Sequence, residues 1–358
     1  MTRRGLLLAV VLLAVVAAPV EAASPGGPRL ALTEYQGGAD VFLLKSIAPD
    51  GSAPLQLAEG GKRKRPVPAP LEIPSWSPDG TSIAFTGTGG RVAGTRGFVV
   101  EDSQIFLAAE DGSGLRVLPG TTGAVSPVFA PDGRTIAFAR QRRRTRPNGR
   151  GGVDVVDESA SVWLADLQTG ESARLTPWRR WLQSYPWSFS PDGSTLLIGR
   201  RARRDGPSSL VALRLDGAKG ALLARRATDG VYSPDGTRIA FLRTRLRRFV
   251  SAEDGKAGLE TTTDLYTMRS NGSEVRRLTR TPRSLEVWPS WDPSGERLAY
   301  TRLRGGSFLG FLGFGAAILQ VNADGSCGST IRPPRRGVAY WGAAWQPGSG
   351  REAGRIAC

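Results

Sequence analysis

Short apolar segments alternate with polar turns along this chain, and one combination of the two recurs. Trp76-Ser77-Pro78-Asp79-Gly80 is an aromatic residue followed by a polar turn, and the apolar segment Ile83-Ala84-Phe85 comes next. The other copies are Phe129–Phe138, Phe189–Ile198, Tyr232–Phe241, Trp291–Tyr300 (with the acid moved) and the shortened Trp345–Gly348. Measured between prolines, the spacing runs from 43 residues (Pro191 to Pro234) to 60 (Pro131 to Pro191). A repeat of this length made of short strands is typical of β-propellers and related arrays.

The turn in each copy has a composition that favours a tight hairpin. Proline presets φ at the second position, aspartate accepts hydrogen bonds from the backbone that follows it, and glycine adopts the left-handed corner. The segments on either side then pair as antiparallel strands. A structural role is therefore the main interpretation of the turn aspartates. Calcium binding is the alternative, although each turn supplies one carboxylate rather than a ligand cluster.

Each repeat also contains a second hairpin, marked by Asp-Gly or Asn-Gly between apolar segments, as at Asp111-Gly112. Two hairpins give four strands per repeat, so the sequence predicts an all-β, six-bladed β-propeller of four-stranded antiparallel blades. Arg29–Thr33 is similar to a second strand without a first, and Ala344–Pro347 to a first strand without a second. We therefore expect strands from both chain ends to close the ring, with the tail Arg355–Cys358 as a competitor for that place.

The aromatic-Ser-Pro-Asp-Gly unit followed by Ile-Ala-Phe resembles the WD-like repeat of TolB-type propellers, which also occurs in relatives of prolyl oligopeptidase. The resemblance covers nearly all of the chain after its first residues. It implies a propeller scaffold and says less about function, because the same blades serve many roles. Two departures matter. TolB itself has an additional N-terminal α/β domain, and the peptidases have a hydrolase domain with a Gly-x-Ser-x-Gly motif that this sequence lacks.

The N-terminus predicts export. Arg3-Arg4 precede an apolar segment from Leu6 to Val16, and small residues around Ala22 fit a signal peptidase site. An uncleaved anchor is the alternative, but it needs a longer apolar span. We expect residues 1–22 to be a signal peptide and residues 23–358 a single propeller domain without a transmembrane span. The predicted location is periplasmic, cell-wall-associated or extracellular.

The sequence contains no histidine and two cysteines. The absence of histidine excludes Ser-His-Asp and Cys-His catalysis and the commonest zinc sites. Cys327 and Cys358 are expected to form a disulfide that fixes the C-terminal tail to the turn at Asp324-Gly325-Ser326. A metal or redox role is the alternative, although two isolated cysteines make no site. We expect no cofactor.

Positive charge is concentrated between the predicted strands. The chain has 48 Lys and Arg against 32 Asp and Glu, a net charge of +16. Connections from second to third strand, and from one repeat to the next, open on the same side of a propeller, so their side chains should form one basic rim. The candidate rim residues are Lys62, Arg63, Lys64, Arg65, Arg142, Arg143, Arg144, Arg146, Arg201, Arg203, Arg204, Arg245, Arg247 and Arg248. Such a rim attracts anionic partners.

The predicted function is a non-catalytic, monomeric binding protein of the cell envelope. Its partner would be a protein, an anionic envelope polymer or an anionic lipid surface, and no nucleic acid is expected. Two other interpretations of the charge stay open: the arginines reflect composition in solvated loops, or they pair within the molecule. The apolar segment Phe308–Ala317 would either enter a bilayer surface or a partner, or fold over the central channel.

An enzyme is the alternative function. Some six-bladed propellers hydrolyse lactones or esters with a calcium ion held by acidic residues at the channel mouth. Acidic residues also occur in the predicted loops of the basic rim: Glu101, Asp102, Asp154, Asp157, Glu158, Asp254 and Glu260. Their spacing matches no ligand pattern, and they would serve equally well as partners of nearby arginines. A metal-dependent hydrolase is therefore kept as the alternative.

Overall fold

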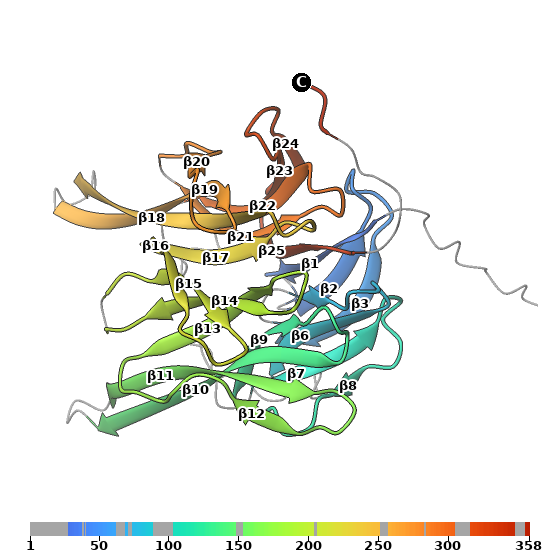
Figure 1. The fold of residues 1–358 in the computed structure, drawn as a ribbon. Helices are drawn as coiled ribbons and strands as arrows, with labels where there is room; N and C mark the ends of the chain where they lie inside the picture. Colours follow the sequence, from blue (N-terminus) through green and yellow to red (C-terminus); the bar gives the residue numbers. More distant parts are fainter. Residues whose placement is uncertain are drawn as a thin grey trace, which may run out of the picture.

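The chain is an all-β propeller in a computed structural model that describes residues 28–61 apart from Gly38 and Asp40, and residues 69–70, 74–88, 103–147, 153–203, 206–250, 257–282, 284–304, 316–347 and 355–358. Figure 1 shows its antiparallel sheets following one another in sequence order, from the blue N-terminal strands to the red C-terminal ones. Within the described ranges no helix is long and apolar enough to cross a membrane. The predicted signal peptide lies outside those ranges.

The described strands form five sheets, and the largest of them consists of two antiparallel units. These units, β9–β12 and β13–β16, are joined by a single parallel pair, Ala160 with Gln183. In ring order, the first sheet consists of β25 (Val338–Trp345), β1 (Leu30–Gln36), β2 (Val41–Ile47) and β3 (Leu55–Gly61), and the second of β4 (Ala69–Pro70), β5 (Ser75–Trp76), β6 (Ser82–Thr88), β7 (Ser103–Ala109) and β8 (Arg116–Val117). The third and largest sheet combines the unit β9 (Ala124–Phe129), β10 (Thr135–Pro147), β11 (Val153–Asp166) and β12 (Ser172–Arg174) with the unit β13 (Gln183–Phe189), β14 (Thr195–Arg201), β15 (Ser209–Arg214) and β16 (Ala221–Arg225). The fourth sheet consists of β17 (Ala227–Tyr232), β18 (Arg238–Val250), β19 (Ala257–Arg269) and β20 (Arg276–Arg277), and the fifth of β21 (Ser284–Trp291), β22 (Arg297–Arg304), β23 (Ala316–Asn322) and β24 (Ser329–Arg332). A count of sheets does not decide the number of blades, so six stays a prediction.

Strands from both chain ends share one sheet, as the sequence predicted. β1 pairs with β25, with Leu30 opposite Trp345. The side chain of Gln346 holds this junction together. Its Oε1 accepts a hydrogen bond from the Arg29 backbone N–H (3.3 Å), and its Nε2 donates to the carbonyl of Gly80 (2.8 Å). One glutamine therefore connects the first strand, the last strand and the turn of the neighbouring sheet.

We expect Gln346→Ala to lower the free energy of unfolding by about 1–2 kcal/mol, because a buried backbone donor and acceptor lose their partner. Denaturant unfolding followed by tryptophan fluorescence measures this change. Gln168→Ala is a matched control, since Gln168 is exposed in the turn after β11. Equal stability of the two variants would show that the Gln346 contacts do not hold the ring closed.

The repeated turns have the structural role that the sequence predicted. Asp79 Oδ1 accepts hydrogen bonds from the Ser77 hydroxyl (2.5 Å) and from the Thr81 backbone N–H (3.1 Å). The hydrogen bond from Ser77 is the main reason why the pKa of the Asp79 carboxyl is lowered. In the copy with the moved acid, Asp292 occupies the serine position and accepts a hydrogen bond from the Arg297 backbone N–H (3.1 Å). In this copy the carboxylate that accepts the turn's hydrogen bonds lies at the serine position instead of the aspartate position, and the turn conformation is the same.

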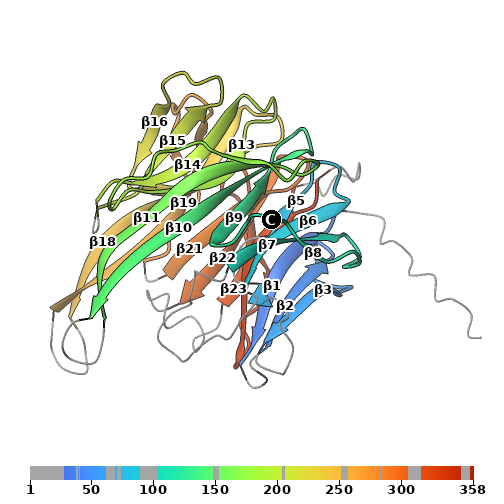
Figure 2. The same cartoon turned by 90° about the horizontal axis from the view of Figure 1, so that it is seen from below.

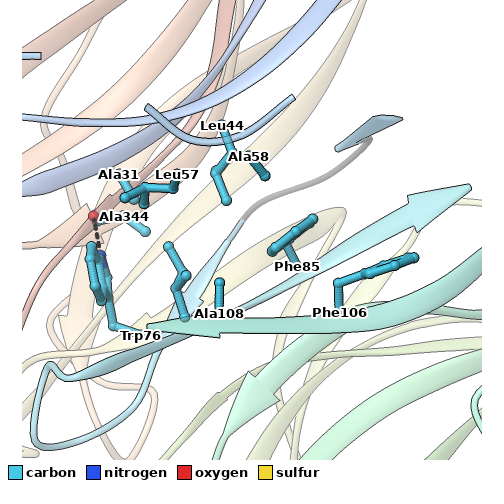
Figure 3. Close-up of a cluster of buried hydrophobic side chains, with 10 residues drawn as sticks. Ala31, Leu44, Leu57, Ala58, Trp76, Phe85, Phe106, Ala108 and Ala344 are labelled. Carbon is cyan, nitrogen blue, oxygen red and sulfur yellow. Dashed lines mark hydrogen bonds between the residues drawn. The ribbon is translucent and has the colours of Figure 1, made fainter. Parts of the chain in front are cut away.

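Apolar strands and aromatic residues of the repeat form the contacts between neighbouring sheets. Ile83, Ala84 and Phe85 on β6 are all completely buried, as expected for a strand covered on both faces. Figure 3 shows Phe85 in a cluster of apolar side chains, where the Trp76 indole N–H donates to the Ala344 carbonyl (3.1 Å). Trp291 makes the same kind of bond to Val231, also at 3.1 Å. The repeated tryptophans thus tie one inner strand to the next.

The arginine-rich segments in the second halves of β10 and β18 form strands, although the sequence predicted loops there. The pairing of β10 with β9 ends at Arg140, but its pairing with β11 continues to Pro147. The pairing of β18 with β17 ends at Arg243, but its pairing with β19 continues to Val250. We call residues 142–147 with 153–159 the first arm, and residues 245–250 with 257–262 the second arm. Each extends a hairpin by roughly 20 Å beyond its sheet.

Opposite charges face one another across the first arm. Within the first arm, Arg143 stands opposite Glu158, and Arg144 stands opposite Asp157. Opposite charges across an antiparallel pair stabilise it, so the arm needs no apolar face. Figures 1 and 2 show both arms projecting on the same side of the propeller. The β13–β16 unit, with its shorter strands, lies between them in the ring.

The C-terminal tail is attached to the turn between β23 and β24. Cys327 and Cys358 form the predicted disulfide, with their Cα atoms 4.9 Å apart. Asn322 exchanges two hydrogen bonds with the backbone of Ile356, at 2.9 and 3.0 Å, and Arg355 pairs with Asp324. The tail therefore does not compete with β25 for the closing position, which answers the question that the sequence left open.

Candidate functional site

The inner strands of the propeller enclose a cavity, called the channel below. The inner strands β5, β9, β13, β17, β21 and β25 border a cavity of about 940 Å³. Its wall is mostly apolar and rich in proline and tryptophan, as is typical of ligand pockets. Among the described residues that line it, Arg201 and Asp229 are the charged ones.

Bulges in the inner strands shape the wall of this cavity. Ser126, Asp229, Trp288 and Gly342 have φ values of +56°, +52°, +58° and +68°, and each lies at a register shift of its strand. A bulge bends a strand and re-aims its side chains, and bulges are common next to functional sites. Ser126, Asp229 and Trp288 all line the cavity. The bulge is therefore a repeated device, and the residue that occupies it differs between repeats.

Asp229 is a buried carboxylate at such a bulge, 6% exposed. Its Oδ1 accepts a hydrogen bond from the Thr228 hydroxyl (2.8 Å), and its Oδ2 accepts one from the Trp288 backbone N–H (3.1 Å). Burial raises its pKa to about 6, although these two hydrogen bonds lower it. No charged neighbour contributes to the shift. Perturbed carboxylates of this kind are candidates for functional sites.

Aromatic and amide side chains occupy the neighbouring wall. The Trp187 indole covers Gly199, where an added Cβ would lie 2.4 Å from Nε1. Gln141 donates a hydrogen bond to the Tyr185 hydroxyl (2.9 Å), which joins β10 to β13. Trp187, Trp288 and Trp341 line the cavity from β13, β21 and β25. Among the described residues, the wall therefore carries indole rings from three inner strands and one carboxylate, that of Asp229.

A second buried carboxylate, Glu286 on β21, lies between two sheets rather than in the channel. It is completely buried. Its oxygens accept hydrogen bonds from the Leu265 backbone N–H (3.0 Å), from the hydroxyls of Thr279 and Thr281, and from Arg302 (2.8 Å). Every oxygen is satisfied within the protein, so this group has a structural role.

Part of the predicted basic rim lies in the described residues. Arg142, Arg143, Arg144 and Arg146 lie on the first arm, Arg245 lies on the second, and Arg201 and Arg203 lie at the end of β14 and just after it. The backbones of Arg247 and Arg248 also belong to the second arm. Lys62, Arg63, Lys64, Arg65 and Arg204 lie outside the described residues, and so does most of the apolar segment, Phe308–Gly315.

Several rim arginines have partners inside the protein. Arg142 lies over the Trp178 ring at 4.0 Å, and Arg143 pairs with Glu158 at 3.8 Å. Arg201 donates to Gln183 at 2.5 Å, and Arg245 pairs with Asp264 at 3.5 Å. Arg144, Arg146 and Arg203 are exposed, as are Arg142, Arg143 and Arg245. The interpretation that some of this charge pairs internally is therefore supported for Arg142, Arg143, Arg201 and Arg245.

The acidic residues considered for a metal site are dispersed. Asp157 Oδ1 accepts a hydrogen bond from the Trp181 backbone N–H (3.2 Å), and Glu158 is the partner of Arg143. Glu101, Asp102 and Asp254 lie outside the described residues. In the described part of the chain, no group of three Asp, Glu or Cys side chains is arranged to hold a metal ion.

Sequence reasoning missed Asp229 and Glu286. Both are single acidic residues inside otherwise apolar or small inner strands, Ala227–Tyr232 and Ser284–Trp291. An acidic residue three to five positions before the repeated aromatic residue was the available signal. This signal does not show which of the two carboxylates, Asp229 or Glu286, faces the channel, because the direction of the side chain depends on the bulge.

Curated proteins that match the chain include TolB proteins of the Tol-Pal system. No family model matches the chain. The Tol-Pal system protein TolB of Anaeromyxobacter dehalogenans (strain 2CP-C) is 33% identical over 145 residues, which is 40% of this chain and 27% of that protein. The chain therefore matches little more than a quarter of this relative's length.

Solved structures agree on the fold. TolB from Acinetobacter baumannii superposes with a TM-score of 0.63 at 20% identity, over 90% of this chain and 67% of that one. The putative TolB from Agrobacterium tumefaciens gives a TM-score of 0.55 at 17% identity, over 86% and 89% of the two chains. The repeated turn, the antiparallel blades and these relatives together show that this chain is similar to TolB-like β-propellers.

Proposed function

We propose that this protein is an exported, non-catalytic propeller that binds an acidic protein partner in the cell envelope through its two arms. The observation that carries the proposal is that both arms project on the same side and present exposed arginines there. The name of the curated relatives, Tol-Pal system protein TolB, supports a role in protein assembly at the envelope. Nothing in the described channel wall supports the metal-dependent alternative.

The domain organisation belongs to the same proposal. Residues 1–22 act as a signal peptide, and residues 23–358 form one six-bladed propeller that works as a monomer. Six inner strands border the channel, and the eight-stranded sheet divides into two units of four strands at its single parallel pair. Both observations support a count of six blades. The mature protein is then periplasmic, bound to the cell wall or extracellular.

The arms suit an acidic partner because their exposed arginines are not all neutralised internally. Arg144 and Arg146 on the first arm, and Arg203 just after β14, are exposed beside the internally paired residues of the rim. A cluster of one sign increases the rate at which an oppositely charged partner associates, and salt weakens that effect. Because the two arms flank a unit with shorter strands, a partner can touch both arms and the unit between them.

Replacing Arg144, Arg146 and Arg203 by Ser tests the proposal. Poly-glutamate serves as the acidic protein probe, and phosphatidylglycerol vesicles and cell-wall fragments are measured alongside it over a salt series. We expect wild-type protein to bind poly-glutamate at low salt, with affinity that falls at least about tenfold towards physiological salt and in the triple variant. A pull-down from envelope extract should lose the same protein band in that variant.

A second triple variant controls for net charge. Arg116, Arg174 and Arg276 are exposed on the outer strands β8, β12 and β20, so their replacement by Ser removes the same charge elsewhere. This control should bind like wild type. If both variants lose binding equally, overall charge and not the arms would explain it. Binding to vesicles but not to poly-glutamate would replace the protein partner by a lipid surface.

A further inference from the structure

The carboxylate in the channel, Asp229, has no cationic partner among the described residues. Asp229 forms no ion pair with a described Lys or Arg, and both of its hydrogen bonds come from neutral donors, the Thr228 hydroxyl and the Trp288 backbone. A buried carboxylate without a counter-charge costs free energy. It borders a cavity large enough for a ligand, about 940 Å³. Charge complementarity therefore indicates a cation as the occupant.

The surroundings of Asp229 select the kind of cation. β17, which carries Asp229, packs between β13 and β21, which carry Trp187 and Trp288. All three side chains line the same cavity, and Trp341 lines it from the next inner strand. Indole faces attract organic ammonium groups, and aromatic residues around an acidic group are the usual binding site for them. Asp229 is the one carboxylate among the described residues of the wall, whereas a hard metal ion is usually held by several carboxylate and carbonyl oxygens.

Arg201 is the other charged group of the described wall and does not occupy the place of the ligand. It donates a hydrogen bond to Gln183 at the start of β13, on its own unit. Asp229 contacts the opposite neighbour, β21. Asp229 thus has an indole ring on each neighbouring strand, and among the described residues the nearby Arg201 is engaged with Gln183 instead.

We propose that the channel binds a small organic ammonium ion, with its charge on Asp229 and its alkyl groups against Trp187 and Trp288. This inference does not depend on the proposed function of the arms, which lie outside the cavity. It assigns the channel to a ligand class that the relatives' names do not mention.

Choline tests the proposal when it is compared with 3,3-dimethylbutan-1-ol, its neutral analogue of nearly the same shape. We expect calorimetry at about pH 8 to show choline binding at least about tenfold tighter than the neutral alcohol. Asp229→Asn should remove that preference, and Trp187→Leu should weaken choline binding by roughly fivefold or more. Asp216→Asn, an exposed turn residue outside the cavity, should bind choline like wild type.

The pH dependence provides a test that needs no variant. Choline binding should weaken about tenfold from pH 8 to pH 5, because protonation removes the Asp229 charge. The other ionisable groups that face it are Arg201, Tyr185 and Tyr232, none of which is a carboxylate; burial raises the pKa of Tyr232, and Glu286 on β21 is paired with Arg302 outside the cavity. Absence of choline binding, equal binding of the neutral alcohol, or an unchanged affinity in Asp229→Asn or at pH 5 would overturn the proposal.

Discussion

Replacing Glu286 by Ala is expected to lower the free energy of unfolding by about 3–5 kcal/mol, because it breaks a buried ion pair by removing one partner. Glu286 is completely buried, and Arg302 lies 2.8 Å from its Oε1 with about a quarter of its side chain exposed. In the variant Arg302 keeps its charge without the carboxylate. The Thr281 hydroxyl also loses its acceptor.

Denaturant unfolding measures this loss, and a second Glu–Arg pair gives a matched control. Glu158 lies 3.8 Å from Arg143, and both side chains are more than a third exposed. Exposed pairs contribute little, so Glu158→Ala should change stability by less than about 1 kcal/mol. Similar losses of stability in the two variants would contradict the view that burial determines how much each ion pair contributes to the free energy of unfolding. A loss of less than about 1 kcal/mol in Glu286→Ala would show that water reaches Arg302.

The position of this carboxylate explains its large expected effect. β21 pairs with β22 in its own sheet and packs against β19 in the preceding one. Glu286 bonds to the backbone of Leu265 on β19 and to Arg302 on β22. One side chain therefore connects two sheets at the level of the inner strand, where the repeat otherwise relies on aromatic residues.

The repeated turn made the fold predictable from the sequence. Proline, aspartate and glycine each have a local conformational preference, so the turn at Asp79 can be identified without knowledge of the rest of the chain. The pairing of β1 with β25 was also predictable, because each end lacked one strand of a repeat. The disulfide followed from the presence of only two cysteines in a chain expected to be exported.

The arms and the buried carboxylates were not predictable in the same way. Strand prediction relies on apolar residues at alternate positions, and the β10 side of the first arm lacks them beyond Gln141. Their pairing depends on register, which places Arg144 opposite Asp157. The role of Asp229 depends on a bulge with positive φ, and nothing in the single sequence identifies a non-glycine residue in that conformation.

Asp229→Asn is expected to change the pH dependence of stability by about 3 kcal/mol, the free energy that corresponds to a shift of roughly two pKa units. Burial raises the pKa of Asp229 from the ordinary 3.8 to about 6. Between these values the folded protein holds a proton that the unfolded chain has released. This group therefore stabilises the fold fully below pH 3.8, and the contribution is lost as the pH rises through 6.

The measurement is the difference in free energy of unfolding between wild type and Asp229→Asn, taken from about pH 3.5 to pH 8. Taking the difference cancels the other titrating groups and any constant cost of the amide. The variant should gain relative to wild type as the pH rises. Asp50→Asn is a control of opposite sign, because hydrogen bonds from Ser52 lower the pKa of exposed Asp50. A flat difference for Asp229 would mean that its carboxylate is solvated in the channel. In a second series with choline present, choline should reduce the change with pH of the wild-type minus Asp229→Asn difference, in proportion to its binding. The stability that wild type loses at high pH would then be the cost of keeping a charged site ready for a cation.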